Sequence, residues 1–129
     1  MIVEHYNLDS AALLALGGHK QVSGLVHVAA GDPTVRLWVP IVSALGAERE
    51  RTGIVDYLGI LDVLYTLDAD YEAAHAIADL HRRNVPFGVA PAAVHAARPT
   101  LDRPDGALVA IVAPSDYEGL GAPVMDLNS

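Results

Sequence analysis

The sequence predicts one α/β domain, a three-layer sandwich in which helices flank a central, mostly parallel β-sheet. Short apolar runs alternate with helical segments, and each gap between runs is long enough for a helical crossover. The 129 residues are close to the commonest size of a single domain. An apolar content of 52% can fill a core without disulfides, and the sequence contains no cysteine. We therefore treat residues 1–129 as a single domain.

The first half of the chain contains two predicted strands and four predicted helices. Asp9-Ser10 offers an N-cap directly after the first apolar run, and Gly17-Gly18 ends the helix that follows. Pro40 stands where the third helix would begin. The expected elements are a strand over 1–8, helices over 11–16 and 21–30, a strand over 35–39, and helices over 41–51 and 54–61.

The second half continues the alternation. Asp68 and Asp70 can cap the clearest amphipathic helix, which carries Ala74, Ile77 and Ala78 on one face. Residues 108–112 are almost continuously apolar, as in a strand covered on both faces. The expected elements are a strand over 63–67, helices over 71–83 and 91–98, a strand over 108–112, one helical turn over 117–120 and a last strand over 124–127.

The charge and the apolar pattern count against several classes of protein. The basic residues are scattered and the net charge is −8, so the sequence shows no basic stripe of the kind that grips nucleic acid non-specifically, which counts against a nuclease without removing that class. No run approaches the 18 apolar residues of a membrane-spanning helix, so no membrane partner is expected. The first residues lack the basic head of a secretion signal. Together with the absence of cysteine, these features favour a cytoplasmic protein.

Acidic residues follow two of the predicted strands. Asp9 comes directly after the first strand, and Asp116 follows the strand over 108–112. In parallel sheets, functional groups collect at the carboxyl ends of the strands. Asp9 therefore has two interpretations from the residues alone: a structural N-cap or a metal ligand at a strand end.

Four segments in this order resemble the PIN domain family, and in particular its VapC-type toxin nucleases. The first is Leu8-Asp9-Ser10-Ala11-Ala12-Leu13-Leu14, which resembles the opening signature of these domains. The resemblance covers nearly the whole chain, and its specificity lies in order and spacing. The other three segments are Val39-Pro40 before a helix bearing Glu48, the stretch 66–74 that enters an alanine-rich helix, and the strand end 111–117 with Asp116.

The resemblance implies a site and a chemistry. Active members of the family hold Mg²⁺ or Mn²⁺ on acidic side chains and cut a phosphodiester, usually of RNA. Carried over to this sequence, the metal-binding and catalytic residues would be Asp9, Glu48 and Asp116. Hard divalent cations prefer such oxygen ligands, and a bound metal activates water as the nucleophile. Many small bacterial members are toxins that a partner antitoxin silences.

The sequence departs from the family pattern at the acidic positions. The helix after the alanine-rich one has no acid, since none occurs between Asp79 and Asp102. Glu48 lies about two residues beyond the commonest distance from Val-Pro. Ser115 stands at the last acidic position, which leaves Asp116 one residue out of register. His95, one helical turn past the missing acid, could face the same cleft, although an imidazole suits Zn²⁺ or Mn²⁺ better than Mg²⁺. The alternative is a packing or surface residue, which is the usual role of a histidine on an alanine-rich helix.

These departures favour a degenerate PIN-like domain that has lost nuclease activity and acts as a binding or regulatory module, with no cofactor. The alternative is an active ribonuclease with a relaxed carboxylate site and bound Mg²⁺ or Mn²⁺. A chain this apolar is expected to expose a hydrophobic patch and to form a homodimer. A protein partner of antitoxin type is a further expectation, and RNA is a partner only if the domain is active.

Overall fold

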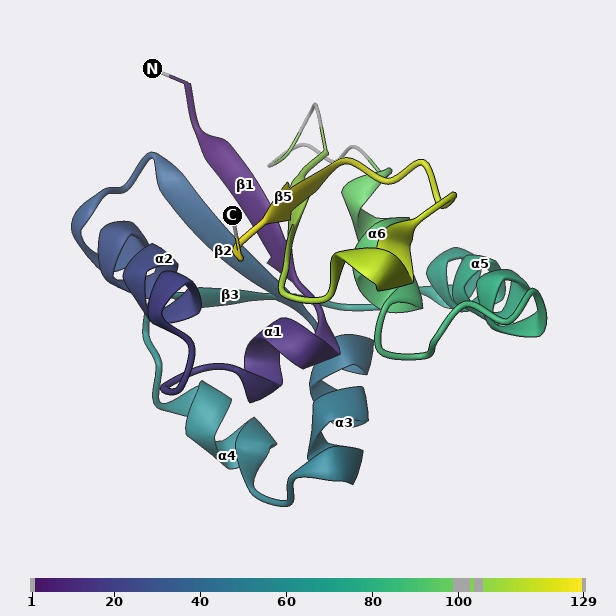
Figure 1. The fold of residues 1–129 in the computed structure, drawn as a ribbon, viewed down its shortest axis with the longest axis horizontal. Helices are drawn as coiled ribbons and strands as arrows, with labels where there is room; N and C mark the ends of the chain where they lie inside the picture. The colour runs from purple at the N-terminus through teal and green to yellow at the C-terminus, as the bar shows by residue number, and fades with distance from the viewer. Residues whose placement is uncertain (1, 99–102, 104–105, 129) are drawn as a thin grey trace.

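Five parallel strands form one sheet at the centre of the molecule (Figure 1). The computed structural model describes residues 2–98, 103 and 106–128. The strand order across the sheet is β3-β2-β1-β4-β5, so β1 lies in the middle. This confirms the parallel sheet expected from the sequence. The strands are β1 (Glu4–Leu8), β2 (Val35–Pro40), β3 (Leu64–Leu67), β4 (Leu108–Ile111) and β5 (Val124–Asp126).

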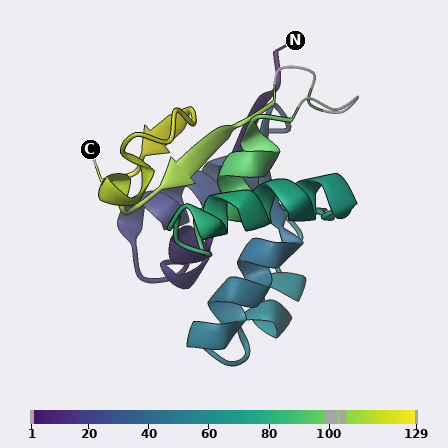
Figure 2. The same cartoon turned by 90° about the vertical axis from the view of Figure 1, so that its right-hand side faces the viewer.

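Helices cover both faces of the sheet, which completes the three-layer sandwich. One face packs against α1, α2 and α4, and the other against α6, with α5 outermost on that side (Figure 2). The third helix, α3, extends from the end of β2 and contacts α1, α4 and α6. The helices are α1 (Ser10–Leu14), α2 (Lys20–Gly31), α3 (Ile41–Glu50), α4 (Ile54–Gly59), α5 (Tyr71–Arg82), α6 (Ala90–Ala96) and the 3₁₀ turn η1 (Pro114–Tyr117).

The central strand β1 shows how alternation builds the two layers. Tyr6 and Leu8 belong to the larger core cluster, which includes Leu13 of α1 and Val22 of α2. Asn7 points to the opposite face, where its Nδ2 donates to the backbone oxygen of Ala92 in α6 at 3.3 Å. Successive strand residues therefore serve opposite layers, as the period of two requires.

The register of the sheet brings three strand ends to one edge. Asn7 of β1 pairs with Trp38 of β2, and Leu8 pairs with Ala110 of β4. Because all three strands run in the same direction, the segments that follow them start side by side. The residues after β1, β2 and β4 therefore form one rim, which is where functional groups gather in sheets of this kind.

Several boundaries differ from expectation by a few residues, and two of these differences have a clear physical cause. Helix α1 ends at Leu14 rather than near residue 16, because the chain closes there in tight turns before Gly17, which has a φ of +82°. The helical turn expected over 117–120 lies instead at Pro114–Tyr117. Proline fixes its own φ at a helical value and needs no backbone donor at a first position, so Pro114 starts the turn earlier. None of the helices in the described segments is long and apolar enough to cross a membrane.

Candidate functional site

Asp9 lies at the centre of the rim, directly after β1. Its backbone is extended, and its Oδ1 accepts a hydrogen bond of 2.8 Å from the amide of Ala12. This geometry confirms the N-cap interpretation of Asp9, since the cap satisfies one of the free amides that begin a helix. The side chain is buried, with the whole residue only 1% exposed.

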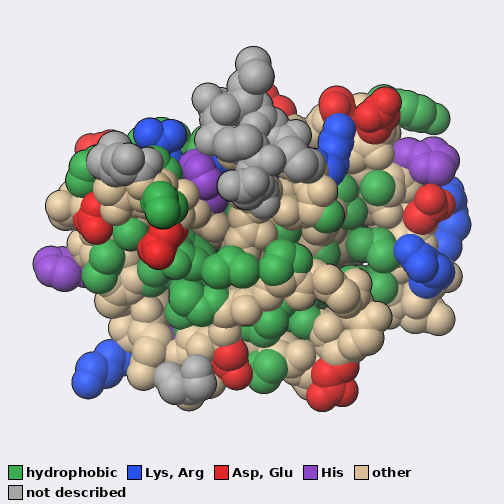
Figure 3. Space-filling view, turned by 90° about the horizontal axis from the view of Figure 1, so that it is seen from above, with side chains coloured by type: hydrophobic (Ala, Val, Ile, Leu, Met, Phe, Trp, Pro, Cys, Tyr) green, Lys and Arg blue, Asp and Glu red, His purple; other side chains and the backbone are tan. Residues whose placement is uncertain are grey.

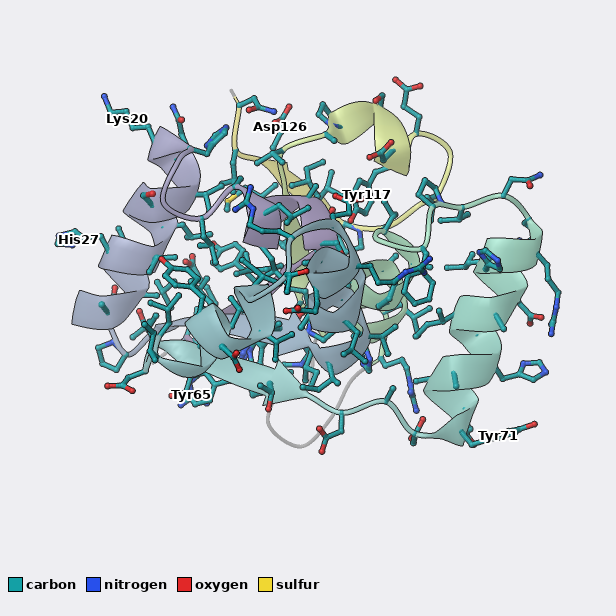
Figure 4. The ribbon with its side chains drawn as sticks, turned by 90° about the horizontal axis from the view of Figure 1, so that it is seen from below. Lys20, His27, Tyr65, Tyr71, Tyr117 and Asp126 are labelled. Carbon is teal, nitrogen blue, oxygen red and sulfur yellow. The ribbon has the colours of Figure 1, made fainter. Side chains whose placement is uncertain are left out.

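Tyr117 occupies the other oxygen of the same carboxylate. Its hydroxyl donates to Asp9 Oδ2 at 2.6 Å, and the ring is buried. The tyrosine is the last residue of η1, which follows β4, the neighbour of β1 in the sheet. Figure 4 shows Tyr117 directed into the molecule beneath η1, whereas Tyr71 points outward. Tyr117 thus covers Asp9 from the β4 side.

Burial sets the ionisation of this pair. Removal from water raises the pKa of Asp9, and the negative charge of Asp116 raises it further, while the hydrogen bonds from Tyr117 and Ala12 act in the opposite direction. Burial and the adjacent Asp9 carboxylate also raise the pKa of Tyr117 strongly. Tyr117 therefore keeps its proton at neutral pH and remains the donor.

The structure brings together only two of the three acids singled out from the sequence. Asp116 is exposed on η1, next to Tyr117, and close enough for its charge to act on Asp9. Glu48 has a different role: its carboxylate accepts hydrogen bonds from the amides of Gly53 at 2.9 Å and Val55 at 3.1 Å. These backbone donors lower the pKa of Glu48. Glu48 thus caps the start of α4.

Gly46 stands two residues before Glu48, near the place where the family pattern puts its acid. A Cβ on Gly46 would lie 2.9 Å from the Oγ of Ser10, the neighbour of Asp9. Ser10 is held there because its Oγ donates to the backbone oxygen of Ser43 at 2.7 Å. Gly88 closes on Ser10 from the other side, with a Cβ distance of 3.1 Å. The backbone of α3 and of the loop before α6 therefore lies close to Ser10, and a hollow of about 390 Å³ opens beside these residues.

Helix α6 presents apolar residues where the resemblance implies another acid. Ala90, Pro91, Ala92 and Ala93 are all buried. His95, on the same helix, is buried too, and its Nε2 has no hydrogen-bond partner among the residues that the structure describes. Burial lowers the pKa of His95, with further lowering by Arg103 and Arg98, opposed by Asp70.

The charges that act on His95 are thus those of Asp70, Arg98 and Arg103, and Asp9 is not among them. His95 also meets Arg103 through its backbone oxygen, which accepts from the guanidinium at 2.7 Å. The structure does not place this histidine with the rim carboxylate.

The rim does not fit a divalent metal ion in this arrangement. Mg²⁺ and Mn²⁺ need several accessible oxygens, whereas Asp9 is buried with both oxygens in hydrogen bonds. Within residues 2–98, 103 and 106–128, no three His, Asp or Glu side chains lie close enough to hold a metal ion. The metal and catalytic roles of Asp9, Glu48 and Asp116 remain predictions.

Sequence reasoning missed Tyr117 and Gly46. The hydrogen bond between Tyr117 and Asp9 joins residues 108 positions apart, so no local spacing announces it. The one available signal was an aromatic residue directly after a polar strand end. Gly46 lies inside a helix, where glycine is unfavourable, but α2 carries another glycine, Gly24, without a close contact, so the residue type alone does not identify the packing.

Comparisons with known proteins support the fold. No protein-family model matches the sequence, and no curated protein sequence matches it. A chain in the crystal structure of DNA-bound VapBC from Salmonella typhimurium matches with a TM-score of 0.61 and 20% identity, over 98% of this chain and 99% of that one. The class defined by the sheet, its helices and this similarity is therefore a PIN-like α/β fold.

Proposed function

We propose that this chain is a PIN-like domain that has lost metal-dependent nuclease activity and acts by binding. The observation that carries the proposal is the Asp9 carboxylate, which is 1% exposed and bonded at both oxygens, by Ala12 and by Tyr117. A metal ion at this carboxylate would have to displace the tyrosine and would then find few other ligands. The apolar start of α6 and the glycine at position 46 point in the same direction.

The binding surface that fits this function is formed by α3 and α4. Large apolar side chains are exposed on both helices, and Ile41 and Val55 line one apolar pocket of about 430 Å³ between them. Exposed apolar surface of this kind marks protein interfaces. The exposed residues are Ile41, Leu45, Val55, Tyr57 and Ile60.

The occupant we propose for this α3–α4 surface is a second copy of the chain, so that the protein forms a homodimer. We propose the cytoplasm as its location. An antitoxin-like protein segment is the alternative occupant, because the similar structure is a VapBC complex. Both are proteins with apolar anchors, and the acidic net charge of −8 does not favour RNA at this surface.

Two measurements test the proposal: nuclease activity and metal binding. We expect no cleavage of a fluorescent single-stranded RNA by the wild-type chain in Mg²⁺ or Mn²⁺, and no calorimetric heat with Mn²⁺ up to millimolar concentration. RNA cleavage that Asp9→Ala abolishes, with an unchanged circular dichroism spectrum, would contradict the proposal.

An active Mg²⁺- or Mn²⁺-dependent ribonuclease is the second candidate, because Asp116 does lie near Asp9. In that case Tyr117 would have to move away for the metal to bind. The Tyr117→Phe variant discriminates the two, since it frees Asp9 Oδ2 while keeping the ring. We expect Tyr117→Phe to stay inactive; cleavage by this variant or a gain of Mn²⁺ binding would favour the ribonuclease.

A further inference from the structure

A hollow lies on the side of the molecule away from the α3–α4 surface, between α5, α6 and the loop that leads into β5. Its volume is about 400 Å³, within the range of small-molecule sites. Figure 3 looks onto this side: apolar side chains run across the middle, and charged ones gather at the end formed by α5. The lining residues are Ala76, Asp79, Leu80, Arg83, Ala93, Val94, Ala97, Arg98, Leu120, Gly121, Ala122 and Pro123.

The hollow lies between two hydrophobic core clusters, and the residues that separate them are too small to fill the space. Val94 and Leu80 belong to the cluster beneath α5, whereas Leu120 and Ala122 belong to the cluster around β4. The residues between them are mostly alanine and glycine, which leaves apolar walls but no side chain to fill the space. An apolar ligand segment would gain free energy there by leaving water.

The charged side chains around this hollow differ in whether they have an ion-pair partner. Arg98 is engaged by Asp70, at 3.1 and 3.2 Å from its two carboxylate oxygens. Asp79 is contacted by Arg82 at 3.2 Å and by His75 at 3.5 Å.

Arg83 follows the end of α5 and makes no ion pair with an acidic side chain in the described part of the chain. The hollow therefore combines apolar walls with one cation that is not neutralised by those acids.

The length of the hollow limits the ligand. Along α5 it extends from Ala76 to Arg83, about 10 Å at 1.5 Å per residue. A straight chain of about this length can lie on the alanines while a carboxylate at one end meets Arg83. Asp79 stands nearby and disfavours a second negative charge, so a monoanion fits better than a dianion.

We propose that this hollow binds a short, linear amphipathic carboxylate, of the class of medium-chain fatty acids. The apolar chain lies against Ala76, Ala93 and Ala97, and the carboxylate pairs with Arg83. The guanidinium offers two parallel donors, which suit a carboxylate. The site is separate from the rim at Asp9 and does not depend on whether the domain cuts RNA.

Calorimetric titration of the full chain with octanoate tests the proposal. We expect saturable 1:1 binding, weakened at least about tenfold by Arg83→Gln, which corresponds to about 1.4 kcal/mol. Ala97→Leu should abolish binding by filling the hollow, and its exposed position keeps the core intact. Arg51→Gln is the control: this exposed arginine neither lines the hollow nor pairs with Asp79, and its removal should leave the affinity unchanged.

Two other ligands distinguish recognition of the carboxylate head group from non-specific hydrophobic binding. We expect 1-octanol to bind at least about tenfold more weakly than octanoate, and octyltrimethylammonium not to bind. No heat with octanoate at millimolar concentration would overturn the proposal, as would equal affinities for octanoate and 1-octanol. A dimer that Ala97→Leu converts to a monomer would also overturn it and assign the hollow to a second copy of the chain.

Discussion

At the scale of single residues, the Asp9 side chain has a structural use at a position where the resemblance implies chemistry. It caps α1 through one oxygen and accepts from Tyr117 through the other. The second bond is charge-assisted whenever Asp9 is ionised. Both bonds favour the ionised form, but burial outweighs them and leaves the pKa of Asp9 raised. The carboxylate is therefore held at a cost in stability.

That cost predicts the effect of Asp9→Asn. The folded state binds the Asp9 proton more tightly than the unfolded state, so stability declines as pH rises from the unfolded value of 3.8 through the folded pKa. Asparagine caps helices well and carries no charge. We expect Asp9→Asn to raise the free energy of unfolding at pH 7 and to change it little at pH 4.

Urea unfolding at the two pH values measures this difference. Asp68→Asn, an exposed acid in the loop before α5, is the control and should change neither value. A loss of stability at pH 7 in Asp9→Asn would contradict the account, because it would mean that the charge itself stabilises the fold.

For His95 we expect the opposite dependence of stability on pH, in the range between pH 5 and pH 7. Its pKa is lowered in the folded state, by burial and then by Arg103 and Arg98, so the unfolded chain binds its proton more tightly. The contribution to stability is present above the ordinary histidine value of 6.5 and is lost as pH falls below it. We expect His95→Gln to flatten the fall in stability between pH 7 and pH 5.

Thermal unfolding across that range provides the measurement. His27→Gln removes an exposed histidine from α2 and serves as the control, with a slope like that of the wild type. If His95→Gln retained the full wild-type slope, His95 would not be the group that titrates.

At the scale of elements, the glycines of two helices differ in whether a close contact requires them. Gly46 in α3 lets the helix approach Ser10, which is fixed by its bond to Ser43. No described atom outside the local helix backbone lies within 4 Å of the position of a Cβ on Gly24 in α2, so no such contact requires glycine there. The same substitution should therefore have opposite effects in the two helices.

We expect Gly24→Ala to stabilise the protein by about 0.5–1 kcal/mol, the helix propensity difference between the residues. Gly46→Ala should destabilise it by about 1–2 kcal/mol, because the new methyl group overpacks against Ser10. Chemical denaturation of both variants gives the comparison. Adding Ser10→Ala should recover part of the Gly46→Ala loss; strict additivity of the two changes would show that the contact does not matter.

At the scale of the whole molecule, apolar surface and acidic charge act together. The net charge of −8 opposes non-specific association, so pairing has to depend on a localised apolar surface. The α3–α4 surface is such a place, and Ile60, 73% exposed, is its most exposed large side chain.

We expect the wild-type chain to be a dimer by light scattering at high micromolar concentration and Ile60→Glu to be a monomer with an unchanged fold. A charge placed in an apolar interface loses its water without gaining a partner. Ile2→Glu, which alters another exposed isoleucine outside this surface, should remain dimeric. A monomeric wild type, or a dimer that tolerates Ile60→Glu, would rule out pairing through this surface.

The sequence by itself determined the fold class and nearly every element. Alternating apolar runs and helical periods depend on neighbours a few residues apart, so they can be found without coordinates. Local chemistry also identified the caps, since Asp9 and Asp70 both accept from the amide three residues ahead. The PIN-like resemblance rested on the same local order of motifs, and the structure supports it at the level of the fold.

Only the tertiary structure decided what surrounds Asp9. Tyr117 comes from 108 positions away, and Gly46 approaches Ser10 from another helix. Glu48, chosen from its spacing, caps α4 instead, because the turn after α3 brings the amides of Gly53 and Val55 to its carboxylate. Such contacts depend on how strands and helices pack in space, and the free energy of that packing is not encoded in any short stretch of residues.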